Sequence, residues 1–148
     1  MKKTKKIKTN RSLFKYIVFG ILTLGIYNLV FLHKLAKDMN QIGEGDRRHT
    51  RGVFAYIVFT ALTLGIYQYV WWYKLANRIK RNGARYHCYI EGDGTTVLLW
   101  MTLGCLLCGF GPLIAEYIVF HNMNDLADAY NKRTESPMYV IREFLAGR

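Results

Sequence analysis

Three long stretches without Asp, Glu, Lys or Arg constrain this chain more than any other feature. They cover residues 16–33, 52–73 and 94–115 and are 18, 22 and 22 residues long. A helix rises about 1.5 Å per residue, so each stretch would measure about 27–33 Å, against about 30 Å for the hydrocarbon core of a bilayer. Apolar residues cover every face of these stretches, whereas a helix of a soluble domain keeps a polar face. The sequence therefore predicts an all-α integral membrane protein with three spanning helices.

The charged residues between these stretches are mostly basic. The 148 residues carry 21 Lys plus Arg against 10 Asp plus Glu, which gives a formal net charge of +11. Seven of the basic residues fall within residues 1–15, which contain no acid. Basic clusters beside apolar spans bind anionic headgroups and set the orientation of a membrane protein. We therefore expect membrane lipids as partners, together with another membrane protein or a second copy of the chain, and no nucleic acid.

The chain contains an internal repeat. When residues 11–40 are aligned with residues 51–80, sixteen of thirty positions match, including the strings YIVF, LTLGIY and KLA. A divergent third copy is indicated by YIVF at 117–120 and by Leu126-Ala127, which matches the Leu-Ala of KLA. Such units tend to pack on one another. The expected organisation is a polybasic cytoplasmic N-terminal tail (1–15), membrane units at 16–42, 51–83 and 94–131, each with a short amphipathic extension, and a polar tail with a short amphipathic helix (132–148).

The repeated motif resembles a known family. A basic residue, an apolar run, T-x-G-I-Y, an aromatic cluster with Trp and then K-L-A is similar to domain of unknown function 4234, and the likeness covers about residues 11–131. It implies a multi-pass protein of the bacterial cytoplasmic membrane and implies no activity. Two departures stand out: Phe31-Leu32 replaces the Trp pair in the first unit, and GFGP replaces TLGIY in the third.

The TLGIY centre of each unit falls in the middle of the expected span. Glycine lets helices approach closely, so we interpret this centre as a helix–helix packing surface with a kink or close contact at each glycine. A broken helix that lines a path for a small molecule or an ion is the alternative. The residues of this surface are Thr23, Gly25, Tyr27, Ala61, Thr63, Gly65 and Tyr67. The interfacial anchors expected beside it are Lys34, Arg51, Trp71, Trp72 and Lys74.

A second topology stays open. TLGIY could form the turn of a re-entrant hairpin that returns every basic loop to the same side of the bilayer. Each leg would then have about nine residues and measure roughly 13 Å, half a bilayer. Irregular backbone at that depth must be buried in protein. Three spanning helices with a cytoplasmic N-terminus are therefore the preferred prediction.

Glu116 is the acid embedded in an apolar stretch, and it is a candidate intramembrane ionisable site. Cys105 and Cys108 lie in the third uncharged run, where cysteine packs as a small hydrophobe. We expect no catalytic residue, metal or cofactor. The predicted function is that of a non-catalytic interaction protein or accessory subunit of the cell membrane. The alternative is a small cation- or proton-coupled transporter or pore.

Overall fold

Every regular element in the described parts of the chain is helical. The computed structural model describes residues 5–106 and 109–146. The elements are α1 (Leu13–Leu22), α2 (Ile26–Ile42), α3 (Val53–Leu62), α4 (Ile66–Arg85), α5 (Gly94–Thr102), the 3₁₀ helix η1 (Leu103–Leu106), α6 (Gly111–Glu135) and α7 (Pro137–Leu145). The all-α prediction is confirmed for these residues.

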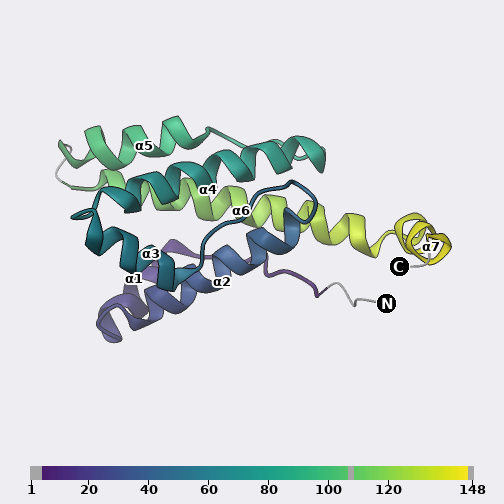
Figure 1. The fold of residues 1–148 in the computed structure, drawn as a ribbon, viewed down its shortest axis with the longest axis horizontal. Helices are drawn as coiled ribbons and strands as arrows, with labels where there is room; N and C mark the ends of the chain where they lie inside the picture. The colour runs from purple at the N-terminus through teal and green to yellow at the C-terminus, as the bar shows by residue number, and fades with distance from the viewer. Residues whose placement is uncertain (1–4, 107–108, 147–148) are drawn as a thin grey trace.

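Six of the helices form three helical hairpins. Hairpin 1 consists of α1 and α2, hairpin 2 of α3 and α4, and hairpin 3 of α5 and α6 joined through η1. Each hairpin has a short first leg of 9 or 10 residues and a longer second leg of 17, 20 or 25 residues. The three hairpin turns lie at one end of the molecule, and both chain termini and α7 lie at the other (Figure 1).

The predicted integral membrane fold with three spanning helices is wrong. None of the helices in the described ranges combines the length and the apolar character that crossing a bilayer requires. The chain turns back within each uncharged run, so each run is divided between two helices, and a first leg of 10 residues measures only about 15 Å. The expected kink at each TLGIY glycine is also wrong, because a complete turn between two helices occupies that place.

The core lies between the second legs of the hairpins. In Figure 1, α6 runs between α2 and α4, and it contacts both. The Leu-Ala pair that repeats in the sequence supplies the centre of this core: Leu35, Leu75 and Leu126 are only 0–1% exposed. The neighbouring alanines are buried with them. The aromatic residues of the second unit extend this core, with the Trp72 ring 6.2 Å from that of Phe120.

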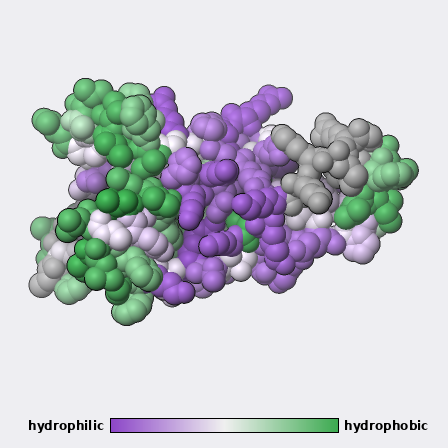
Figure 2. Space-filling view, turned by 90° about the horizontal axis from the view of Figure 1, so that it is seen from below, coloured by the Kyte–Doolittle hydropathy of each residue, from purple (hydrophilic) through white to green (hydrophobic). Residues whose placement is uncertain are grey.

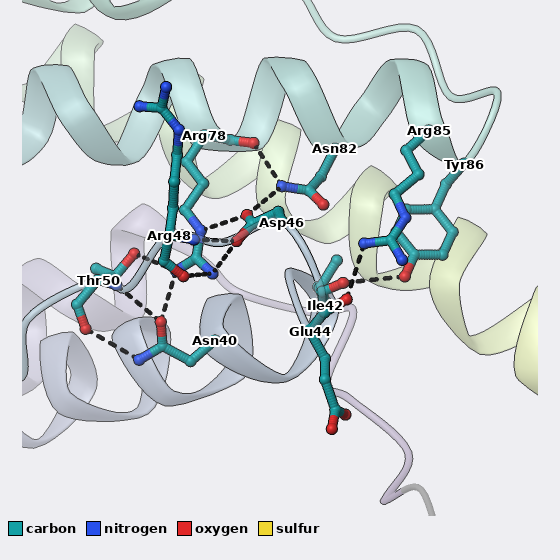
Figure 3. Close-up of polar contacts among 10 residues, drawn as sticks. All are labelled: Asn40, Ile42, Glu44, Asp46, Arg48, Thr50, Arg78, Asn82, Arg85 and Tyr86. Atoms are coloured by element: carbon teal, nitrogen blue, oxygen red, sulfur yellow. Dashed lines mark hydrogen bonds and ion pairs between the residues drawn. The ribbon is translucent and has the colours of Figure 1, made fainter.

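A buried arginine holds the loop between α2 and α3 against α4. Arg78 is 3% exposed, and its Nε donates to Asp46 Oδ2 at 2.7 Å while Nη1 donates to Thr50 Oγ1 at 2.8 Å (Figure 3). The Asn40 side chain forms two hydrogen bonds with the backbone of Thr50, at 2.8 and 2.9 Å. Partial burial works against ionisation of Asp46, but hydrogen bonds from Arg78 and Asn82 outweigh it and lower the Asp46 pKa. The loop is therefore fixed by an ion pair together with side-chain hydrogen bonds.

Replacing Arg78 by Met tests this arrangement. The substitution leaves the Asp46 carboxylate without its ionic partner, so we expect the free energy of unfolding to fall by about 3 kcal/mol. Urea unfolding followed by circular dichroism measures the change. Lys80→Met, at an exposed position on the same helix, is the control and should change the free energy by less than about 0.5 kcal/mol. Equal effects of the two substitutions would show that the buried ion pair does not hold the loop.

Candidate functional site: three apolar hairpin tips

The three hairpin turns expose large apolar side chains at one end of the molecule. Leu24 and Leu64, at the turns of hairpins 1 and 2, are each 95% exposed. We call the following exposed residues the apolar end: Ile21, Leu22, Leu24, Ile26, Leu62, Leu64, Ile66, Leu103, Leu106 and Phe110. Figure 2 shows this apolar surface at one end, beside a broad hydrophilic middle. An exposed apolar patch with polar borders marks a surface that meets a partner or a membrane.

Hairpins 1 and 2 turn with nearly identical backbone geometry. The turn residues Leu24 and Gly25 have φ angles of 51° and 90°, and their equivalents in hairpin 2 have 50° and 94°. Glycine suits such angles because it has no Cβ, whereas a leucine in the left-handed region costs about 1–2 kcal/mol. Both hairpins therefore place a large apolar residue, fully exposed, in an unfavourable conformation. Strain of this kind is typical of functional positions.

The turn satisfies its own backbone. The N–H groups of residues 23–26 donate to carbonyl oxygens of residues 19–23, at 2.7–3.2 Å. Thr23 completes the pattern, since its Oγ1 accepts from the N–H of Tyr27 at 2.9 Å and donates to the carbonyl of Phe19 at 2.6 Å. The equivalent bonds recur in residues 59–67. The N–H groups of these turns therefore need no water, which lowers the cost of placing such a turn in lipid.

Hairpin 3 reaches the same end with a different turn. A Cβ added at Gly111 would lie 2.2 Å from the carbonyl oxygen of Trp100 and 2.4 Å from the Cα of Gly104. Only glycine therefore allows the two legs to approach this closely. Gly109 has a φ of 79°, and the adjacent Phe110 is 62% exposed. The GFGP sequence thus contributes to a turn at the same end of the molecule as the two TLGIY turns, by a different backbone geometry.

The residues predicted to pack helices lie in these turns. A Cβ at Gly25 would meet no atom within 4 Å, and Ala61 is exposed. Within one chain, Gly25 and Gly65 supply turn geometry and Thr23 and Thr63 supply capping. Tyr27 and Tyr67 are half-buried, each with its ring 5.2 Å from a phenylalanine of the first leg. Packing of these small residues against another chain stays a prediction.

Basic residues lie at the base of the apolar end in hairpins 1 and 2. Lys34 and Lys74 are exposed and lie eight residues beyond the starts of α2 and α4, about 12 Å along the helix. Arg51 is exposed, with its Cζ 4.8 Å from the centre of the Phe59 ring. Trp71 and Trp72, expected beside these cations at a membrane interface, are instead 3% and 2% exposed and belong to the core. The boundary of the apolar end is therefore marked by cations.

Glu116 lies on the first half of α6, where it is largely buried beside Tyr16 and Tyr56. No hydrogen bond or ion pair joins its carboxyl group to another residue in the described ranges. Burial raises its pKa to about 7. Both protonation states of Glu116 are therefore accessible near neutral pH.

The comparison with known families agrees with the repeat. The family described as "Domain of unknown function (DUF4234)" matches residues 11–81 and again residues 51–125. The chain belongs to this family. The first match contains hairpins 1 and 2, and the second runs from hairpin 2 into α6, so the DUF4234 unit corresponds to two consecutive hairpins. No curated protein and no solved structure matches the chain.

Sequence reasoning missed Leu24 and Leu64 as functional candidates in this DUF4234 chain. The available signal was the order T-L-G between two apolar runs, because a glycine after a helix is a common stop signal and threonine favours caps. The length of the uncharged run favoured one spanning helix instead of a turn at this place.

The turn geometry predicts the effect of Leu24→Asn combined with Leu64→Asn. Asparagine tolerates the left-handed conformation better than leucine, and the leucine side chains bury almost nothing within the chain. We expect the free energy of unfolding in urea to stay unchanged or to rise by up to about 2 kcal/mol. A loss of more than about 1 kcal/mol would show that these leucines stabilise the fold itself.

Burial of Glu116 predicts a pH dependence. Its pKa is 4.5 when unperturbed and about 7 in the folded chain, so folding favours the protonated form and stability falls as the pH rises from about 4.5 to 7. Glu116→Gln should raise the free energy of unfolding at pH 8 by up to about 3 kcal/mol and have little effect at pH 4. Urea unfolding at both pH values measures this, with the exposed Glu91→Gln as control. A pH-independent effect of Glu116→Gln would contradict the assignment.

Proposed function

We propose that this chain is a non-catalytic interaction protein that attaches to the surface of the cell membrane. Its three hairpin tips enter one leaflet of the bilayer, and the cations at their base contact anionic headgroups. The observation that carries this proposal is the gathering of all three hairpin turns at one end of the molecule (Figure 1), each with exposed apolar side chains.

The dimensions support insertion into a single leaflet. The distance from the start of α2 or α4 to its first lysine is about 12 Å, and the first legs measure about 15 Å. Half of the hydrocarbon core is also about 15 Å thick. Tips inserted to this depth would bring Lys34 and Lys74 to the level of the headgroups. The self-satisfied turns would leave none of their N–H groups unpaired in the hydrocarbon.

Two kinds of attraction support stable attachment. Burying one leucine side chain contributes about 1.5–3 kcal/mol, and a lysine or arginine beside anionic lipids contributes about 1 kcal/mol. A single weak anchor gives reversible binding, whereas an apolar anchor combined with a basic patch holds a protein at a membrane. The chain offers both, with its net charge of +11 and its apolar end.

The opposite end of the molecule supports the interaction part of the proposal. Helix α7 lies away from the hairpin tips and exposes Met138, Ile141 and Phe144, which are 58–79% exposed (Figure 1). With the tips in a bilayer, these side chains would face away from it. The alternative of a cation- or proton-coupled transporter or pore stays an untested prediction.

Co-sedimentation with phosphatidylcholine vesicles tests the attachment. Leu24→Asn combined with Leu64→Asn should weaken vesicle binding by about a hundredfold, because about 1.5 kcal/mol is lost at each tip. Met138→Asn combined with Ile141→Asn is the matched control, since it removes two exposed apolar side chains at the other end. The control should bind like the unaltered protein. Vesicle binding that is unaffected by the tip substitutions would refute the proposal.

A further inference from the structure

A cleft opens at the base of hairpin 2, between the α2–α3 loop and α4. Its volume is about 520 Å³, which is enough for a polar headgroup or a small metabolite. Besides Arg78, which is paired with Asp46, four cations line it: Arg48 and Arg51 from the loop, and Lys74 and Arg81 from α4. Tyr67 lines it on the side of the hairpin tip. The cleft therefore joins the apolar end to the hydrophilic middle of the molecule.

The loop wall of the cleft is held in place through its backbone. The Arg48 carbonyl accepts from Arg78 Nη2 at 2.6 Å, and the Arg51 carbonyl accepts from Trp71 Nε1 at 3.0 Å. The backbone is fixed in this way without help from the Arg48 and Arg51 side chains, of which Arg51 lies over the Phe59 ring. Figure 3 shows the Arg48 side chain running across α4, so that its guanidinium lies away from the polar network that holds its carbonyl. A binding site whose backbone is already fixed loses little conformational entropy when it binds a ligand.

The cations of the cleft are not neutralised by acids. None of the ion pairs in the described ranges includes Arg48, Lys74 or Arg81. The nearby Asp46 is already paired with Arg78. Partial burial lowers the pKa of Arg81, and the positive charge of Arg48 lowers it further. These like charges repel one another, and a bound anion would reduce the repulsion.

The internal repeat provides a comparison within the same molecule. In hairpin 1, Arg11 stands where hairpin 2 has Arg51, and it forms an ion pair with Asp38 at 2.6 Å. The position equivalent to Asp38 in hairpin 2 is Arg78. Likewise Gln41 in hairpin 1 corresponds to Arg81. The two units share their turn and core, but only the second has lost the acid and gained two arginines. Of these two arginines, Arg78 stabilises the loop, whereas Arg81 adds a charge that no acid pairs with in the described ranges.

We infer that this cleft binds the phosphate group of an anionic phospholipid headgroup. The guanidinium groups of Arg48, Arg51 and Arg81 can donate paired hydrogen bonds to phosphate oxygens, and Lys74 adds a point charge. Tyr67, on the side of the apolar tip, would lie beside the start of the acyl chains. This inference rests on the proposed membrane attachment, which would bring Lys74 to the depth of the lipid phosphates. Free phosphate esters share the same chemistry and are distinguished by the test.

The test compares two pairs of substitutions that remove the same charge. Arg48→Gln combined with Arg81→Gln removes two cations from the cleft. The glutamine at position 81 is also the residue that hairpin 1 has at the equivalent position, Gln41. Lys34→Gln with Lys37→Gln removes two exposed cations from hairpin 1, where Lys34 is the repeat equivalent of Lys74. Vesicles of phosphatidylcholine with phosphatidylglycerol should bind the cleft pair at least about tenfold more weakly than the control pair. On pure phosphatidylcholine the two pairs should bind equally.

Equal weakening of both pairs on the anionic vesicles would overturn the inference, because general charge attraction would then explain the binding. The membrane-free arm titrates the protein with glycerol 3-phosphate and follows the indole N–H of Trp71 by NMR. A saturable shift that the cleft pair lacks supports phosphate binding by the cleft even if vesicle attachment fails. If this shift occurs but the protein does not prefer the anionic vesicles, the ligand of the cleft is not a lipid. The cleft would then be a binding site for a soluble phosphate ester.

Discussion

The hairpin turn depends on a hydrogen-bonding pattern that leaves none of the N–H groups of residues 23–27 and 63–67 unpaired. Thr23 and Thr63 complete this pattern, because each hydroxyl bonds to both legs of its hairpin. A turn that carried free N–H groups would have to stay in water or be covered by protein. These turns can instead expose leucines at their tips. The apolar end of the molecule follows from this local chemistry.

The two ends of each repeat unit have different roles, exposure at the turn and core packing at the far end. Toward the turn, side chains such as Leu64 point outward and stabilise nothing within the chain. Toward the far end of the second leg, Leu75 and its repeat equivalents pack in the core. Because the tip side chains lie outside the core, we expect that the tips can be altered without unfolding the molecule. The basic residues lie between these regions, where an apolar medium would meet water.

Much of this architecture could be predicted from the sequence, and most of the wrong predictions have one cause. The all-helical class, the repeat units and the family follow from periodicity and from the KLA and TLGIY motifs. The prediction of spanning helices was wrong because an uncharged run of 22 residues fits one long helix as well as two short ones, and length alone does not distinguish them. The capping by Thr63 and the left-handed Gly65 decide between these possibilities.

Other features depend on contacts that no local pattern contains. Trp71 and Trp72 have the composition of an interfacial aromatic belt, yet both are buried, Trp71 against Tyr56 of α3 and Trp72 near Phe120 of α6. The YIVF string at 117–120 matches the first legs of hairpins 1 and 2 in sequence, but it lies on the second leg of hairpin 3. The cleft beside Arg48 needs the loop to be folded against α4, which the Arg78–Asp46 pair achieves across 32 residues.

The central claim, that the hairpin tips enter lipid while the rest of the molecule stays outside, is tested most directly by spin-label accessibility. A label is attached at position 64 or at position 141, in a protein whose three cysteines have been replaced by serine. With vesicles present, we expect the label at position 64 to be relaxed by oxygen and shielded from a water-soluble nickel complex, and the label at position 141 to show the reverse. A label at position 64 that the nickel complex reaches equally with and without vesicles would contradict the claim.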